Sequence, residues 1–417
     1  MKNTYCLLLF LGCYFSFAQN ELIERSLQSS FYDDQQVGFY LYDIDTQKEV
    51  FSYNGISYFL PASNTKIATL YAVATVMKDS IPGIFYYETD SELHFQGTGD
   101  PTFLHPKFDN QRVLNFLKNS TKNLIYHAPA FDDSPFGNGW SWDDYASDYA
   151  PERSPFPIQE NLVYFGRTGK SISASPRYFE DKVTSEKRSF AREFHRNTFY
   201  FAPHKSNIKI PYITSPELTR EILSSVLDKE ISLTFTEIPK KAKILYSRPW
   251  HSVAKYMMEE SDNFLAEQLL IAASAERSME IGSEKLIANL LKNELQNLSQ
   301  APRWIDGSGL SRYNLFSPKS IVQILDKLYK KLPEEEILDL MAVGGKSGTL
   351  KSRYRSKNAY MFGKTGTLSN TVTLSGYLKT NSGKTYIFSL MSNNSTRPLS
   401  QVRNEHEKLL NLIRTNY

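Results

Sequence analysis

Two residues near the N-terminal end have the types and the spacing of a serine nucleophile and its base. In Ser63-Asn64-Thr65-Lys66, a serine and a lysine stand three positions apart, which on a helix places both on one face, one turn from each other. A serine hydroxyl attacks well only when a neighbouring base takes its proton, and a lysine can be that base when burial or another cation lowers its pKa. Taken alone the pattern is weak, because it occurs twice more, in Ser206/Lys209 and Ser252/Lys255.

Two further short motifs follow along the chain. Ser261-Asp262-Asn263 lies between two apolar stretches with helical spacing, and Lys364-Thr365-Gly366-Thr367 leads into a strand. Gly366 would let a substrate backbone lie against the strand edge, and Lys364 offers a fixed positive charge. Each motif is again weak by itself: SxN recurs elsewhere, and Lys346-Ser347-Gly348 imitates KTG. We interpret that second tripeptide as a loop.

The three motifs together are a more specific signal than any one of them alone. The motifs occur in the order SxxK, SxN, KTG, a set typical of β-lactamases and penicillin-binding proteins. Their flanks narrow the comparison, and with them the chain resembles the D-alanyl-D-alanine carboxypeptidase/endopeptidase family, the class C low-molecular-mass penicillin-binding proteins. The segments that carry this resemblance are Pro61 to Lys66, Ser261 to Glu267, Asp306 to Ser311 and Gly363 to Leu368.

The resemblance implies acyl transfer from a peptide to water. Ser63 would attack the carbonyl of the penultimate D-alanine in a peptidoglycan stem peptide, and Lys66 would accept the serine proton. Ser261 would relay a proton to the leaving amine, and Lys66 and Ser261 could share the role of base. Asn263 would hydrogen-bond the substrate backbone and hold Lys66 in place.

The same resemblance assigns substrate binding to the third motif. Lys364 and Thr365 would bind the terminal carboxylate, and Gly366 would leave room at the strand edge. The backbone N–H groups of Ser63 and Thr367 would form the oxyanion hole, worth about 3 kcal/mol per donor in other enzymes. β-Lactam antibiotics mimic the substrate terminus, so they should acylate Ser63 and leave slowly.

Other chemistries find little support. The seven histidines are scattered, with neither an HExxH motif nor a paired metal spacing, so we expect no metal and no organic cofactor. There is no GxSxG elbow and no phosphate-binding loop. Lys plus Arg is 48 and Asp plus Glu is 45, with no long basic block, which argues against a nucleic-acid partner.

The first residues read as an export signal. Lys2 precedes a mostly apolar run, and Ser16-Phe17-Ala18 resembles a signal-peptidase site. The run is shorter than the roughly 20 residues of a membrane span, so we expect a signal peptide over 1–18, no transmembrane anchor, and a periplasmic or cell-envelope location. The alternative is a lipoprotein acylated at Cys13, which Phe10 and Leu11 do not favour. Cys6 and Cys13 both lie in this segment, so the mature chain is expected to contain no disulfide.

The remaining elements must hold these motifs together. Hairpin patterns occur near both ends of the chain, at 38–53 and at 371–391, the second with a turn at Asn381-Ser382-Gly383. Helical patterns follow Pro61 and flank Ser261. We expect an α+β fold in which an antiparallel sheet, closed by the two termini, is flanked by helices. A proline-rich stretch with short aromatic strands interrupts it. The predicted domains are a DD-peptidase domain over 19–81 and 245–417 and a β-rich insertion over 82–244.

Two alternatives stay open at this point. A β-lactamase of the same fold would deacylate quickly, usually with an extra base that the sequence does not reveal, and is normally smaller. A catalytically idle wall-binding homologue would keep the groove without turnover, because function resides in the site and not in the fold.

Overall fold

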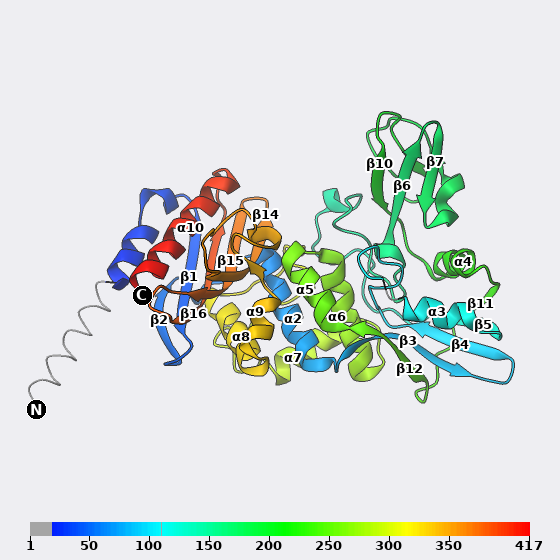
Figure 1. Cartoon of the computed structure of the whole chain (residues 1–417), viewed down its shortest axis with the longest axis horizontal. Helices are drawn as coiled ribbons and strands as arrows, with labels where there is room; N and C mark the ends of the chain where they lie inside the picture. The colour runs from blue at the N-terminus through cyan, green and yellow to red at the C-terminus, as the bar shows by residue number, and fades with distance from the viewer. Residues whose placement is uncertain (1–18, 110) are drawn as a thin grey trace, which may run out of the picture.

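The computed structural model describes residues 19–109 and 111–417, so the predicted signal peptide and both cysteines lie outside the described residues. A large antiparallel sheet lies at one end of the molecule, a block of helices lies in the middle, and the sheets of the insertion lie at the other end (Figure 1). No described helix combines the length and the apolar character needed to cross a membrane.

The large sheet has six strands, and the two ends of the chain meet in it. The first strand runs antiparallel to the last, with Phe39 opposite Leu390, which confirms the predicted closure of the sheet by the termini. The hairpins predicted near 38–53 and 371–391 are also present. In spatial order the strands are β13 (Ala342–Val343), β14 (Met361–Leu368), β15 (Thr371–Lys379), β16 (Thr385–Asn393), β1 (Gln36–Asp43) and β2 (Lys48–Tyr53).

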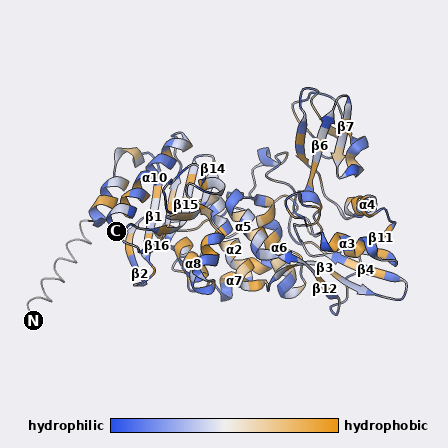
Figure 2. Cartoon of the chain, viewed as in Figure 1, coloured by the Kyte–Doolittle hydropathy of each residue, from blue (hydrophilic) through white to orange (hydrophobic). Residues whose placement is uncertain are grey.

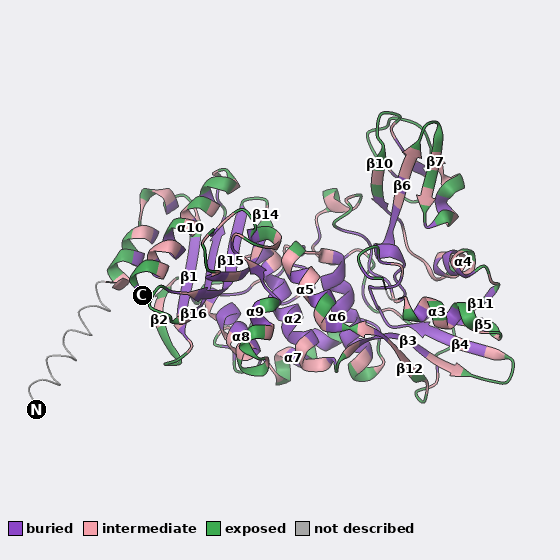
Figure 3. Cartoon of the chain, in the orientation of Figure 1, coloured by how far each residue is buried: buried purple, intermediate pink, exposed green. Residues whose placement is uncertain are grey.

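Helices cover both faces of this sheet. On one face α8 (Pro318–Lys331) packs against β16 and β1. The other face carries helical residues 19–27 and α10 (Leu399–Asn416), whose Leu409, Leu410 and Ile413 are fully buried. Figure 2 shows hydrophobic and hydrophilic residues mixed along these covering helices, as expected for elements with one face in the core. The central strands β1, β15 and β16 are buried along most of their length, as β15 is in Figure 3.

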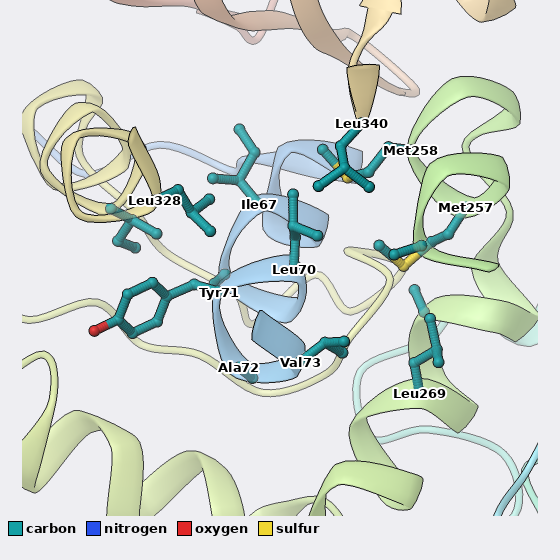
Figure 4. Packing of buried hydrophobic residues seen from close by; sticks show 14 of the residues in the cluster. Ile67, Leu70, Tyr71, Ala72, Val73, Met257, Met258, Leu269, Leu328 and Leu340 are labelled. Carbon is teal, nitrogen blue, oxygen red and sulfur yellow. The ribbon is translucent and has the colours of Figure 1, made fainter. Parts of the chain in front are cut away.

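The helix α2 (Thr65–Val76) runs through the middle of the molecule. Most of its residues are buried, and it packs against α5 (Trp250–Glu260), α6 (Asn263–Ser278) and α8. Figure 4 shows Ile67 and Leu70 of α2 near Met258 and Leu340. Such a helix has little freedom to move, so the residues at its N-terminal end are held firmly. Two further helices, α7 (Glu284–Asn293) and α9 (Glu334–Asp339), complete this part.

The described residues of the insertion form three further sheets. The largest is mixed, in the order β11 (Ile231–Thr234), β5 (Asn123–His127), β4 (Glu92–Gly97), β3 (Ser80–Glu88) and β12 (Lys243–Pro249). The others are β10 (Asn207–Pro211), β6 (Leu162–Thr168) and β7 (Ser171–Ser175), and the pair β8 (Val183–Thr184) and β9 (Phe199–Tyr200). Two helices, α3 (Arg112–Asn119) and α4 (Pro216–Leu227), accompany them. The predicted limits at 82 and 244 fall inside β3 and β12, and the division into domains stays our proposal.

Candidate active site

Ser63 lies in a tight turn directly before α2. The turn is the 3-10 helix Ala62–Asn64, and Ala62 has a positive φ of 49°. Gly309 packs against it so closely that a Cβ at this position would lie 1.9 Å from the Ala62 carbonyl oxygen. From the other side, Asn64 Nδ2 donates a hydrogen bond of 2.7 Å to Ser375 Oγ. The serine is therefore fixed by contacts from two distant parts of the chain.

Lys66, one turn further along, is fully buried below Ser63. Its Nζ donates hydrogen bonds to Ser63 Oγ at 3.0 Å, to Asn263 Oδ1 at 2.6 Å and to the Ser308 carbonyl oxygen at 2.7 Å. Burial lowers the pKa of Lys66 to about 8, because the charged ammonium loses its hydration there. Three nearby carboxylates act in the opposite direction, those of Asp262, Asp306 and Glu267.

The SxN motif forms the turn between α5 and α6. Ser261 ends α5 with a φ of 61°, and Asp262 caps α6 by accepting a hydrogen bond of 2.8 Å from Leu265 N. Asn263 begins α6, and its Nδ2 donates to the Tyr149 carbonyl oxygen at 2.9 Å. Within the described ranges the Ser261 hydroxyl makes no hydrogen bond to Lys66 or Ser63. The structure thus joins Ser63, Lys66 and Asn263 directly, and Ser261 stands in the same turn as Asn263.

The KTG motif lies in β14, where side chains alternate between two faces. Lys364 and Gly366 are buried, and Lys364 Nζ donates to the Thr365 carbonyl oxygen at 2.9 Å. Burial and the neighbouring Lys66 hold the pKa of Lys364 well below its usual range. A Cβ on Gly366 would lie 2.8 Å from the Pro61 carbonyl oxygen, so a larger residue would push the strand away from the Ser63 turn.

Thr365 and Thr367 occupy the other face of β14. Thr365 Oγ1 donates to Thr349 Oγ1 at 2.7 Å, and Thr367 Oγ1 accepts a hydrogen bond of 2.9 Å from Arg403 Nη2. The short strand β13 pairs only with Phe362 and Gly363. Among the described strands, none pairs with the outer edge of β14 from 364 onward, which leaves backbone groups there for a ligand.

A buried loop supports the site from below. Asp306 accepts hydrogen bonds from Gly309 N at 2.9 Å, Ser311 N at 2.7 Å, Asn314 Nδ2 at 2.6 Å and Trp140 Nε1 at 2.9 Å. This network fixes the backbone that presents the Ser308 carbonyl oxygen to Lys66. Sequence reasoning missed this contact, because a backbone oxygen has no residue-type signal. It also missed Arg403, which lies in α10 outside every motif.

No group of three or more His, Cys, Asp or Glu side chains in the described part of the chain could hold a metal ion. The contacts around Ser63 come from hydroxyl, amine, amide and backbone groups, a set of groups suited to acyl transfer by a serine nucleophile.

The profile of the D-Ala-D-Ala carboxypeptidase 3 (S13) family matches residues 19–180 and 225–413. The chain belongs to this family. This confirms the predicted relationship to the low-molecular-mass penicillin-binding proteins.

Individual relatives of the family are distant. The D-alanyl-D-alanine carboxypeptidase DacB of Haemophilus influenzae is 22% identical over 85% of this chain and 85% of its own length. The penicillin-sensitive carboxypeptidase A of Dictyostelium discoideum is 25% identical over 83% of this chain and 80% of its own.

Two solved structures show the fold. Penicillin binding protein 4 of H. influenzae superposes with a TM-score of 0.76 at 19% identity, covering 94% of this chain and 99% of that one. The penicillin G acylated Bd3459 endopeptidase of Bdellovibrio bacteriovorus, solved with the immunity protein Bd3460, gives 0.51 at 18% identity, covering 91% and 94%. The predicted fold is thereby confirmed as that of penicillin binding protein 4, with additional β sheets.

Proposed function

We propose that the protein is a serine-type D-Ala-D-Ala carboxypeptidase/DD-endopeptidase that acts on peptidoglycan stem peptides through an acyl-enzyme. The observation that carries the proposal is the pairing of Ser63 Oγ with a buried Lys66 Nζ at 3.0 Å. Membership of the S13 family supports the reaction class.

In the first step Ser63 Oγ attacks the carbonyl carbon of the penultimate D-alanine, while the Lys66 amine takes the hydroxyl proton. With a pKa of about 8, about one tenth of Lys66 is the free amine at pH 7. Two buried ammonium groups, those of Lys66 and Lys364, also repel each other, which favours the loss of one proton from the pair. An ester forms to Ser63, the peptide bond breaks, and the proton passes to the leaving D-amino acid.

Ser261 is the proposed relay for that proton. The residue ends α5 one position from the Asp262 cap and two from Asn263. Its hydroxyl would come within reach of Lys66 and of the leaving nitrogen once substrate fills the site, since catalytic hydrogen bonds often tighten only in the complex. Water then attacks the ester carbonyl carbon and gives a proton to the same base, and that proton returns to Ser63 Oγ as the ester bond breaks.

The substrate lies along the free outer edge of β14 in this proposal. The N–H groups of Ser63 and Thr367 stabilise the oxyanion, and the Thr365 hydroxyl faces the terminal carboxylate. Lys364 is buried behind the strand, where its Nζ donates to the Thr365 carbonyl oxygen, so it positions the strand and does not contact the carboxylate. Gly366 keeps the edge close to Ser63.

The proposal includes penicillin sensitivity and export. Two relatives support the first: one is named penicillin-sensitive, and the Bdellovibrio endopeptidase was solved acylated by penicillin G. Export through residues 1–18 would place the protein with its substrate. The mass of the mature protein from its native host tests this, because cleavage after Ala18 leaves Gln19 as the first residue.

The deciding experiment is the intact mass of the protein after incubation with benzylpenicillin, with Ser63→Ala as the control, followed by release of D-alanine from a diacyl-L-Lys-D-Ala-D-Ala peptide. We expect one stable adduct on the wild type only, together with peptide hydrolysis. An adduct without hydrolysis would indicate an idle homologue. Penicillin consumed without a lasting adduct would indicate a β-lactamase, and no adduct with intact penicillin would refute the proposal.

A further inference from the structure

The face of β14 that carries Thr365 and Thr367 borders a cavity of about 300 Å³, and the mechanism above gives no role to the side of this cavity that α10 forms. Strands β14 and β15 form one wall, the segment 349–354 forms a second, and α10 forms the third. The cavity therefore adjoins the strand edge along which we place the substrate.

Two arginines line this cavity, and only one of them is neutralised. Arg353 Nη1 pairs with Glu407 at 3.1 Å, and the other oxygen of Glu407 accepts from Tyr354 N at 2.7 Å. Arg403 forms no ion pair with any carboxylate in the described part of the chain; its side-chain hydrogen bond is the one to Thr367 Oγ1. Burial and the nearby Arg353 lower the pKa of Arg403, but a guanidinium stays charged. The cavity thus holds an uncompensated positive charge beside Thr367.

A second observation indicates a missing polar group. His406 also lines the cavity and is almost fully buried. Its Nε2 lies 2.8 Å from Ser392 Oγ, while its Nδ1 has no hydrogen-bond partner among the described residues. Burial and the two arginines lower its pKa to about 3, so the ring is neutral and adds no charge. Buried polar atoms are rarely left without a partner, so the cavity is suited to a polar, anionic guest.

Thr365 and Thr367 lie between the Arg403 guanidinium and the edge of β14 along which we place the substrate. Thr365 and Thr367 stand two positions apart on one strand and therefore share a face. Because Thr367 Oγ1 accepts from Arg403, its own hydroxyl proton is free to donate to an anion. Arg403 uses one of its five N–H donors on Thr367 and retains others for the same anion. Lys364 points to the opposite, buried face and cannot make this contact.

We propose that Arg403 is a specificity-determining residue: together with Thr365 and Thr367 it binds the free carboxylate of the ligand, which is the terminal carboxylate of a D-Ala-D-Ala peptide or the ring carboxylate of a penicillin. This inference rests on the proposed function. It assigns to α10, far from every sequence motif, the selection of substrates that end in an anion.

The test compares a ligand that has a free carboxylate with its neutral methyl ester. The second-order rate constant of Ser63 acylation is measured by intact mass for benzylpenicillin and for its methyl ester, in the wild type, Arg403→Gln and Arg403→Lys. A hydrogen bond to a charged group is worth about 1.5–3 kcal/mol, so Arg403→Gln should lower the rate for the acid about 10- to 100-fold. The rate for the ester should change little, and Arg403→Lys should restore part of the preference.

Arg414→Gln is the matched control on the same helix. The Arg414 guanidinium lies 3.8 Å from the Tyr360 ring centroid and donates to Ser356, neither of which lines the cavity. This variant should keep the wild-type ratio of acid to ester.

The outcomes are separable. Equal losses for acid and ester in Arg403→Gln would mean that Arg403 only supports the strand, and an unchanged ratio in a folded protein would equally overturn the inference. If the wild type itself is not acylated by benzylpenicillin, the proposed function fails instead.

Discussion

Replacing Asn263 removes the shortest hydrogen bond that Lys66 Nζ makes, the one of 2.6 Å to Asn263 Oδ1. This contact stabilises the ammonium form of Lys66, because a carbonyl oxygen accepts from a charged donor more strongly than from a neutral one. Its loss in Asn263→Ala should therefore favour the free amine and lower the pKa of Lys66.

The size of the shift follows from the strength of that bond. A hydrogen bond to a charged group contributes about 1.5–3 kcal/mol, and 1.36 kcal/mol corresponds to one pKa unit. Asn263→Ala should thus move the pKa of Lys66 from about 8 down by about 1–2 units. A water molecule in place of the amide would bring the shift to the lower end of this range.

Asn263→Asp is the matched variant. It also loses the donor to the Tyr149 carbonyl oxygen, so the two variants share that defect. It differs by placing a carboxylate next to the Lys66 ammonium, which should raise the pKa of Lys66 by about 1–3 units.

The assay is the second-order rate constant of Ser63 acylation by benzylpenicillin between pH 5 and 10, which reports the free protein. In the proposed mechanism the free amine is the base, so the rate should rise with pH through the pKa of Lys66. The midpoint should move to lower pH in Asn263→Ala and to higher pH in Asn263→Asp, whatever happens to the maximal rate. Midpoints that stay together would refute Lys66 as the base.

Two further predictions concern how the site is supported. Arg153 lies between the buried carboxylates of Glu267 at 3.4 Å and Asp133 at 3.5 Å. Arg153→Met leaves both carboxylates without their cation and should lower the free energy of unfolding, measured in urea, by about 3–5 kcal/mol. A loss near zero would contradict a stabilising role of these ion pairs. Gly309→Ala should displace the Ala62 carbonyl oxygen, which would lie 1.9 Å from the new Cβ, and lower the acylation rate about 10²-fold by misplacing the nucleophile. A wild-type rate for this variant would show that the turn can adapt.

Much of the fold was predictable because its signals are local. Two apolar-rich segments and the turn at 381–383 identify the hairpin of β15 and β16, and strand patterns at both ends of the chain predict the pairing of β1 with β16. The strand pairing of the insertion was less predictable from the sequence. Its sheet includes parallel pairs, β4 with β5 and β5 with β11, and nothing in a short aromatic strand indicates which partner it takes.

Some residues of the candidate site were also predictable from local sequence signals, and others were not. Ser63, Lys66 and Asn263 could be selected from their motifs, and the structure joins them by hydrogen bonds; their roles in catalysis stay predictions. The Ser308 carbonyl oxygen and Arg403 could not be selected. The first is a backbone group, and the second reaches Thr367 only because α10 packs on the sheet.

The insertion takes part in building the site that it borders. Trp140 Nε1 donates to Asp306, the Tyr149 carbonyl oxygen accepts from Asn263, and Arg153 pairs with Glu267, whose carboxylate in turn accepts from Ser308 N at 2.7 Å. Two of these contacts, those of Trp140 and Arg153, involve buried groups. Removing the insertion would therefore leave the buried carboxylates of Asp306 and Glu267, which lie near Lys66, without these partners. A change in the insertion should therefore alter the position of Lys66 and, through it, the chemistry that we propose for Ser63.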